Sequence, residues 1–234
     1  MRDERALREL GLLEVSRWYA QEMPAAPAEH EATAVVMPAR SANHGAASAD
    51  WDALRSMVAA CTECGLCKQR KQAVFGVGAQ AGPWLFVGEG PGADEDEQGE
   101  PFVGQAGRLL DNMLAAMGCK RGADTYIANV VKCRPPGNRT PTAEEAAACA
   151  PFLDRQIELV GPKLIVALGK SAVMRLLETD ASVASLRGKV HRYRGIPVVV
   201  TYHPAYLLRS LPEKAKAWED LVFARRTLRS ALAA

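Results

Sequence analysis

Short apolar runs alternate along this chain with longer segments in which apolar residues recur every three or four positions. The apolar runs predict buried strands, and the periodic segments predict amphipathic helices. The expected strands are Trp84–Gly88, Thr125–Val131, Leu164–Leu168 and Ile196–Thr201, the last paired in a hairpin with Val190–Tyr193. The expected helices are Trp51–Ala60, Ala106–Met117, Thr142–Val160, Lys170–Leu177 and Glu213–Ala233. Strands that alternate with helices predict an α/β fold, with a mainly parallel sheet covered by helices on both faces.

The first fifty residues have a different pattern. Residues 1–22 carry apolar side chains at helical spacing, whereas residues 23–49 are rich in Ala, Pro, Glu and Ser and show no sustained period. The second composition is typical of a disordered linker. We therefore expect an N-terminal helix and linker over 1–49, followed by one folded domain over 50–234.

The strand Trp84–Gly88 leads directly into the glycine-rich turn 88–92 (GEGPG). Five of the seven residues from Asp94 to Glu100 are then acidic. Open α/β sheets bind ligands where a strand ends in such a turn. A phosphate fits poorly, because Pro91 has no amide donor and the carboxylates would repel an anion. The pattern predicts a ligand that is neutral where it touches the turn, and the alternative is a solvated acidic loop.

Candidate site residues lie at or near the ends of three of the expected strands. Glu89 and Gly90 follow the first strand, Asn129 lies in the second, and His203 follows the fourth. Because parallel strands end at the same edge of a sheet, these residues are expected to converge there as an active site.

Composition and charge limit the class of protein. The chain has 234 residues, of which 48% are hydrophobic and 24% are charged, as in ordinary globular proteins. No apolar run approaches the roughly twenty residues that a membrane span needs, so we expect a cytoplasmic protein, and a monomer because no long apolar stripe is exposed. Residues 1–150 carry 15 basic and 20 acidic residues (net −5), and residues 151–234 carry 14 and 7 (net +7). The basic half permits a polyanionic partner without requiring one.

Six cysteines in a cytoplasmic chain favour metal or cluster ligation over a disulfide framework. Cys61 and Cys64 form a C-x2-C pair, and Cys133 and Cys149 lie far downstream. Two ligands from one turn and two from distant loops can complete a four-thiolate site. Spacing does not separate zinc from an iron–sulfur cluster, and Cys67 forms a second C-x2-C pair with Cys64, so the ligand set stays open.

Five ordered segments together resemble the family 4 uracil-DNA glycosylases, the iron–sulfur branch of the uracil-DNA glycosylase superfamily. They are CTECGLC (61–67), GEGPGADEDEQGEPFVGQAGRLL (88–110), YIANVVKCRPPGNRTP (126–141), LIVALG (164–169) and YHPAYLLR (202–209). The resemblance covers most of 61–209 and leaves the first fifty residues out. It implies a three-layer α/β/α fold with a four-stranded, mainly parallel sheet and a [4Fe–4S] cluster beside it. The implied cluster ligands are Cys61, Cys64, Cys133 and Cys149.

The resemblance also implies a reaction and its substrate, uracil-containing DNA. A uracil is flipped out of the DNA and its N-glycosidic bond is hydrolysed, which leaves an abasic site and initiates base excision repair. Phe102 would stack on the base, and Asn129 would read its O4 and N3–H. His203 and the backbone near Gly90 would stabilise the negative charge that develops on O2.

The remaining implied roles concern the water and the DNA. Glu89 and Glu95 are the candidates for orienting the attacking water, and Glu95 could instead line the C5 edge of uracil and disfavour thymine. Arg139 and Arg209 would contact DNA phosphates. Leu207, or its neighbour Leu208, would enter the space that the flipped base leaves.

Two other functions compete with the glycosylase. One is a non-catalytic or covalent uracil-DNA-binding module stapled by a metal or cluster, but the covalent branch carries a basic insert, and here 104–107 (GQAG) run straight into a helix. The other is a nucleotide-binding enzyme that uses the glycines of 76–78 (GVG). Those glycines precede the strand instead of following it, so the dinucleotide pattern fails.

Overall fold

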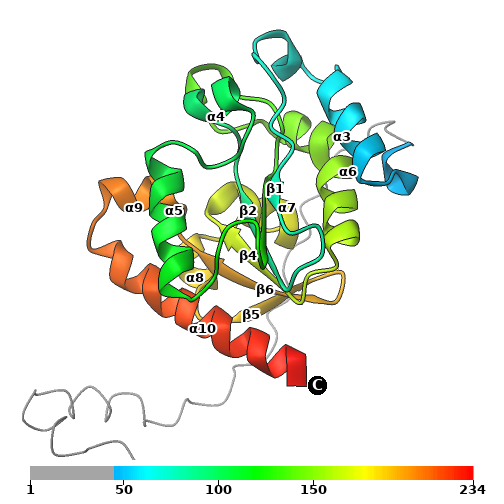
Figure 1. Cartoon of the computed structure of the whole chain (residues 1–234). Coiled ribbons are helices and arrows are strands. Elements are labelled where there is room, and N and C mark those ends of the chain that lie inside the picture. Colours follow the sequence, from blue (N-terminus) through cyan, green and yellow to red (C-terminus); the bar gives the residue numbers. More distant parts are fainter. Residues whose placement is uncertain (1–44, 234) are drawn as a thin grey trace, which may run out of the picture. The chain divides into compact units, whose positions relative to one another are not determined.

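The computed structural model describes residues 45–233, so the helix expected over 1–22 and most of the expected linker lie outside the described residues. One six-stranded sheet forms the centre of the described chain, in the order β1-β3-β2-β4-β6-β5 (Figure 1). The strands are β1 (Val77–Gly78), β2 (Trp84–Gly88), β3 (Thr125–Asn129), β4 (Leu164–Leu168), β5 (Val190–Tyr193) and β6 (Ile196–Thr201).

The expectation of a four-stranded sheet was wrong in number. The four central strands β3, β2, β4 and β6 are parallel, as expected. However, β1 and β5 pair antiparallel with the two outer strands of that set, so the sheet is mixed. The hairpin arm β5 was recognisable in the sequence, whereas β1 has only two residues, too few to show a hydrophobic period.

Eight helices and three short 3₁₀ segments are described around the sheet. The helices are α3 (Trp51–Ala60), α4 (Ala93–Gln98), α5 (Gln105–Ala116), α6 (Ala143–Val160), α7 (Lys170–Leu177), α8 (Val183–Leu186), α9 (Pro204–Arg209) and α10 (Glu213–Ala233). The 3₁₀ segments are η1 (Ala46–Ser48), η2 (Gly65–Lys68) and η3 (Pro136–Asn138). The five helices expected from the hydrophobic period are therefore confirmed to within one residue at each end.

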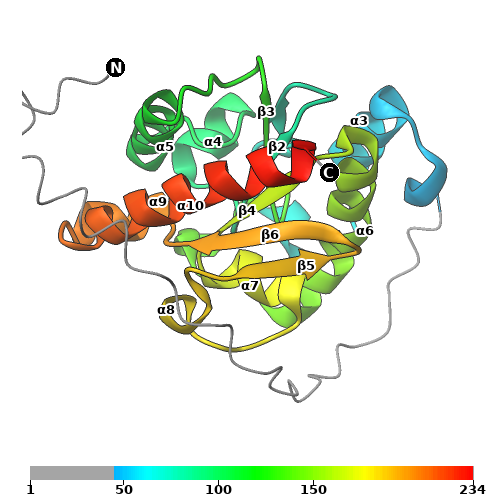
Figure 2. The same ribbon diagram turned by 90° about the horizontal axis from the view of Figure 1, so that it is seen from below.

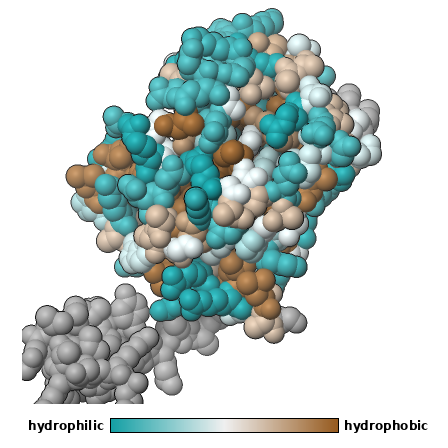
Figure 3. All heavy atoms as spheres, in the orientation of Figure 1, coloured by the Kyte–Doolittle hydropathy of each residue, from teal (hydrophilic) through white to brown (hydrophobic). Residues whose placement is uncertain are grey.

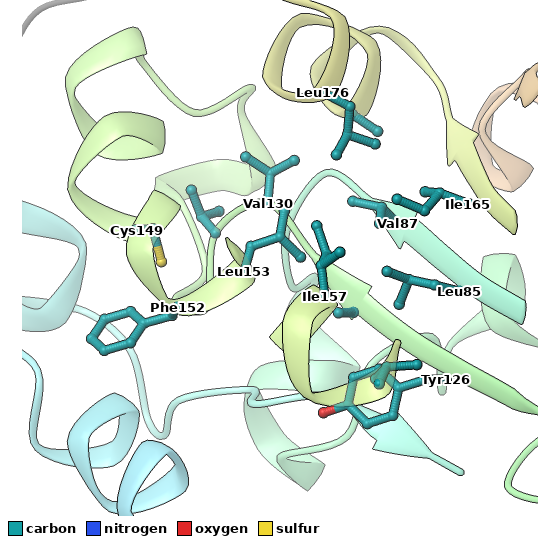
Figure 4. Packing of buried hydrophobic residues seen from close by; sticks show 14 of the residues in the cluster. Leu85, Val87, Tyr126, Val130, Cys149, Phe152, Leu153, Ile157, Ile165 and Leu176 are labelled. Atoms are coloured by element: carbon teal, nitrogen blue, oxygen red, sulfur yellow. The ribbon is translucent and has the colours of Figure 1, made fainter. Parts of the chain in front are cut away.

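The helices cover both faces of the sheet and bury a separate core on each (Figure 2). Along β2, Leu85 and Val87 point to the core beneath α3, α6 and α7, whereas Trp84 and Phe86 point to the core beneath α5 and α10. This alternation is the period of two that a strand imposes on its side chains. Figure 4 shows the first core, where Leu153 and Ile157 of α6 lie against β2. The three-layer arrangement is therefore confirmed.

The described residues that precede Asp50 pack on the domain. Ala46 in η1 is completely buried, and the carbonyl of Ala49 accepts a hydrogen bond from Arg155 Nε of α6 at 2.7 Å. Residues 46–49, expected as the end of the linker, therefore pack on the domain.

Hydrophilic and apolar residues are mixed on the face of the described chain that Figure 3 draws. Figure 3 shows apolar residues on one face only in small groups. None of the helices within residues 45–233 combines the length and the apolar character needed to cross a membrane.

Candidate active site

A cavity of about 470 Å³ opens beyond the carboxyl ends of the central parallel strands. Its walls come from the turn after β2, the helix α4, the end of β3, the loop around η3 and the first turns of α7 and α9. Eight of the residues singled out in the sequence line it: Glu89, Gly90, Glu95, Phe102, Asn129, Arg139, His203 and Arg209. Segments that are far apart in the chain thus meet at one edge of the sheet.

Asn129 is the last residue of β3 and is only 2% exposed. Its side-chain Oδ1 is buried and has no hydrogen-bond partner among the described residues. Lys132 Nζ donates to the Asn129 backbone carbonyl at 2.8 Å and holds the end of the strand. Because buried amide oxygens are nearly always hydrogen-bonded, the unpaired Oδ1 on the cavity wall marks a position for a donor on a ligand.

Gly88 makes room for two of the cavity side chains. It pairs with Asn129 across β2 and β3. A Cβ atom at this position would lie 2.5 Å from Asn129 Oδ1 and 2.5 Å from Phe102 Cζ, closer than real Cβ atoms come to other atoms. The glycine that ends the strand is therefore required by close approach, and the two side chains meet over it.

Phe102 lies opposite, 6% exposed, in an unusual backbone conformation. Its φ is 57°, in the left-handed region that non-glycine residues rarely adopt. Its ring centroid lies 5.5 Å from that of His203, with the two planes tilted by 30°. The aromatic and imidazole rings therefore form one side of the cavity together.

His203 follows β6 and caps the N-terminus of α9. Its Nδ1 accepts a hydrogen bond from the Ala205 backbone N–H at 3.2 Å, so in the neutral ring the proton is on Nε2. Burial lowers the pKa of His203 to about 4; the positive charge of Arg209 acts in the same direction, and Glu95 opposes it. At neutral pH the ring is therefore uncharged and presents one N–H donor.

The two candidate carboxylates have different surroundings. Both oxygens of Glu95 accept backbone hydrogen bonds: Oε2 from the Gly92 N–H at 3.0 Å, and Oε1 from the N–H groups of Val103 and Gly104 at 2.9 and 3.1 Å. These bonds tie the start of α4 to the segment that carries Phe102. Glu95 therefore shapes the cavity wall through the backbone that it holds.

Glu89 instead accepts a hydrogen bond from the hydroxyl of Ser171, in the first turn of α7. The positive end of a helix dipole favours a carboxylate near this position. Ser171 was not singled out in the sequence, because its partner lies 82 residues away along the chain and no local pattern links them.

The residues expected to contact DNA lie around the rim, with one exception. Arg209 is exposed, and Arg139 pairs with Glu145 through two hydrogen bonds of 2.8 and 2.6 Å. Leu207, however, is only 1% exposed, because the phase of α9 turns it into the core, whereas Leu208 is 37% exposed. Of the two leucines expected to enter the base stack, Leu208 is therefore the one that faces solvent, and the wedge role stays a prediction.

Five cysteines line a second, small cavity next to α3 and α6: Cys61, Cys64, Cys67, Cys133 and Cys149. Within residues 45–233, no group of three or more His, Cys, Asp or Glu side chains is arranged to hold a single metal ion. Two of the sulfurs accept hydrogen bonds: Cys133 Sγ from Arg70 Nη1 at 2.9 Å, and Cys149 Sγ from the Lys132 backbone N–H at 3.3 Å. Several thiols beside N–H donors form a donor set that suits an iron–sulfur cluster.

The part of the chain that forms the sheet and this cavity matches a protein-family model. Residues 75–222 match the model described as the uracil DNA glycosylase superfamily. That stretch contains β2, β3, β4 and β6, and every residue of the cavity lies within it.

Curated relatives narrow the class further. The chain is 49% identical over 152 residues to the type-4 uracil-DNA glycosylase of Thermotoga maritima, covering 64% of this chain and 79% of the relative. It is 44% identical over 180 residues to that of Pyrobaculum aerophilum (74% and 91%), and 43% identical over 159 residues to that of Archaeoglobus fulgidus (64% and 79%). The chain belongs to the type-4, or family 4, uracil-DNA glycosylases.

Proposed function

We propose that this chain excises uracil from DNA by holding the flipped base between Phe102, Asn129 and His203, and by stabilising the uracil anion that leaves. Uracil excision is the activity of the family, and the proposal concerns how the residues of this chain perform it. The observation that carries the proposal is the unpaired Asn129 Oδ1 in the cavity that it shares with the other two side chains.

Asn129 supplies the pattern that distinguishes uracil from cytosine. Its Oδ1 accepts from uracil N3–H, and its Nδ2 donates to uracil O4. Cytosine presents an acceptor at N3 and donors at the 4-position, so the same amide would face two mismatched groups. Each buried group left unpaired costs about 1–3 kcal/mol. Stacking of the base on Phe102 adds about 1–3 kcal/mol that does not depend on the base.

His203 acts on the leaving group. When the N-glycosidic bond breaks, its electron pair stays on the uracil, and the sugar becomes an oxocarbenium-like cation. The Nε2–H of the neutral His203 and the backbone near Gly90 donate hydrogen bonds to O2, where negative charge grows. Donors fixed in place before the reaction stabilise such charge without reorganising.

Glu89 holds the water. Its carboxylate lies in the cavity, oriented by Ser171, and stabilises the sugar cation. As the water adds to the anomeric carbon, it passes a proton to this carboxylate. We assign Glu95 to positioning, since both of its oxygens accept backbone N–H groups. Its place on the cavity wall also makes Glu95 the candidate that disfavours the methyl group of thymine.

The rim binds the DNA. Arg139 and Arg209 contact phosphates on either side of the flipped nucleotide, and Leu208 fills the vacated position in the stack. Flipping costs a few kcal/mol, and least for a mispaired base, which favours uracil opposite guanine.

The cysteine cavity holds a [4Fe–4S] cluster in this proposal, with Cys61, Cys64, Cys133 and Cys149 as ligands. Bound there, the cluster supplies a covalent crosslink among distant segments. Two of the ligands flank the stretch that contains Arg139, and the chain between them forms one wall of the active-site cavity. Cys67 lines the cysteine cavity beside these four residues but is not a ligand in this proposal, so a Cys67 variant is the matched control for a ligand variant.

Substituting the cysteines one at a time is expected to separate ligands from the spare thiol. Cys61→Ser should lose most of the bound iron and the broad visible absorbance, because a serine oxygen is a poor ligand for the cluster. Cys67→Ser should keep both. Iron and zinc are measured on anaerobically purified protein. Equal iron loss in the two variants, or zinc in place of iron, contradicts the ligand set.

Release of free uracil from an oligonucleotide tests the proposed function. Duplexes that carry U, T or C opposite G are incubated with the full chain, and the released base and the abasic site are both measured. We expect release from the U duplex alone. Binding of the U duplex without release, or a protein–DNA adduct that survives denaturation, would instead favour a non-catalytic or a covalent binding module.

A further inference from the structure

Arg121 lies outside the cavity but grips the segment that carries Phe102. It sits in the turn region between α5 and β3, with its side chain 19% exposed. Its guanidinium donates from Nη1 to the carbonyl of Pro101 and from Nη2 to the carbonyl of Phe102, each at 2.8 Å. One planar side chain therefore binds two successive carbonyl groups.

Arg121 binds the backbone of the residue in the site that has a strained conformation, Phe102. The φ of 57° at Phe102 is a strained backbone conformation for an L-residue, and it persists only where the surroundings impose it. On the other side, a Cβ atom at position 107 would lie 1.8 Å from the Phe102 carbonyl oxygen, so only a glycine in α5 leaves room for it. The carbonyl is thus confined between the guanidinium of Arg121 and the first turns of α5.

Acidic neighbours fix the guanidinium. Arg121 Nε lies 2.8 Å from Asp111 Oδ1, and Nη1 lies 3.4 Å from Glu100 Oε1. Five N–H donors in a rigid plane can meet two carbonyls and a carboxylate together, which the single ammonium of lysine cannot reproduce.

We propose that Arg121 is a positioning residue for uracil recognition. It holds the backbone of Phe102 in the left-handed conformation, which keeps the phenyl ring beside His203 and ready to stack on the base. The inference rests on the proposed function, because it assumes that uracil stacks on Phe102. Arg121 itself touches neither the base nor the reacting atoms.

The test is a double-mutant cycle read by product binding. Affinity for free uracil is measured by its inhibition of the enzyme, and affinity for undamaged DNA is measured in parallel. In Arg121→Lys, Phe102 is expected to relax from the left-handed conformation, so that uracil binding must restore it. We expect uracil inhibition to weaken about tenfold, which corresponds to about 1.4 kcal/mol. Affinity for undamaged DNA should stay the same within about twofold. In the Phe102→Ala background, the same Arg121 substitution should weaken uracil inhibition less than about twofold, because the ring that it positions is gone.

Two further variants separate positioning from a general loss of structure. Asp111→Asn, which loosens the guanidinium without removing it, should give a weakening of about threefold. Arg108→Lys makes the same exchange on an exposed arginine of α5 and should change nothing. Thermal unfolding of each variant reports whether the fold persists.

The outcomes distinguish the two proposals. Equal effects of Arg121→Lys in the wild-type and Phe102→Ala backgrounds overturn the positioning role, as does an unchanged uracil affinity in Arg121→Lys. If Phe102→Ala alone leaves the affinity for uracil unchanged, the stacking step of the proposed function fails, and the positioning role fails with it.

Discussion

Replacing His203 by alanine is expected to lower the single-turnover rate of uracil release by about 10²–10³-fold, the usual cost of removing one preorganised donor to a developing anion. The substitution deletes the Nε2–H that stabilises O2 and leaves the affinity for DNA within a few fold. His191→Ala is the matched control, because His191 lies in the β5 strand and contacts the Leu186 carbonyl at 2.9 Å, away from the cavity. A His203→Ala rate within threefold of wild type would contradict the electrostatic role.

The pH dependence follows from the lowered pKa of His203. Since the pKa is about 4, the ring stays neutral and the rate is expected to be flat from about pH 8 to pH 5, then to fall as pH drops through 4. Protonating Nδ1 would also break its hydrogen bond with Ala205 N–H. Because the unfolded histidine, with its pKa near 6.5, binds a proton first, this group lowers the stability of the fold as pH falls from about 6.5 to 4. A rate that rises between pH 7 and pH 5 would indicate a charged imidazole instead.

Asn129→Ala is expected to lower kcat/KM on uracil-containing DNA by about 10³-fold and to abolish measurable inhibition by free uracil. Both hydrogen bonds to the base are lost, and a site built on such bonds discriminates strongly through them. The comparison uses Asn112→Ala, an exposed asparagine on α5, which should behave as wild type. Circular dichroism establishes that the fold is intact. Retained activity and retained uracil inhibition in Asn129→Ala would show that another group reads the base.

The long helices and the central strands could be predicted from the sequence. Each of them buries one face or both, and the spacing of its apolar residues shows this. The acidic helix α4 could not be predicted, since it has no apolar stripe: its N-terminus is held instead by Glu95, which also binds the backbone at Val103 and Gly104. The sequence also left open which of the two leucines of α9 is buried. Leu207 and Leu208 are equivalent in the sequence, and only packing against the core decides which of them is exposed.

The cavity was predictable where chain topology alone brings residues together. Asn129 ends β3 and His203 follows β6, and parallel strands end at one edge. Contacts made by side chains across long separations were not predictable. The hydrogen bonds from Ser171 to Glu89 and from Arg121 to the Phe102 carbonyl belong to this group. Neither the spacing nor the residue types in the sequence indicate these partners.

A crystal structure of the protein with free uracil bound tests the proposed recognition of the base most directly. We expect one uracil in the cavity, with its ring against Phe102, its N3–H on Asn129 Oδ1 and its O2 within hydrogen-bonding distance of His203 Nε2. Uracil bound elsewhere, or bound there with its O2 turned away from His203, would contradict the proposed recognition.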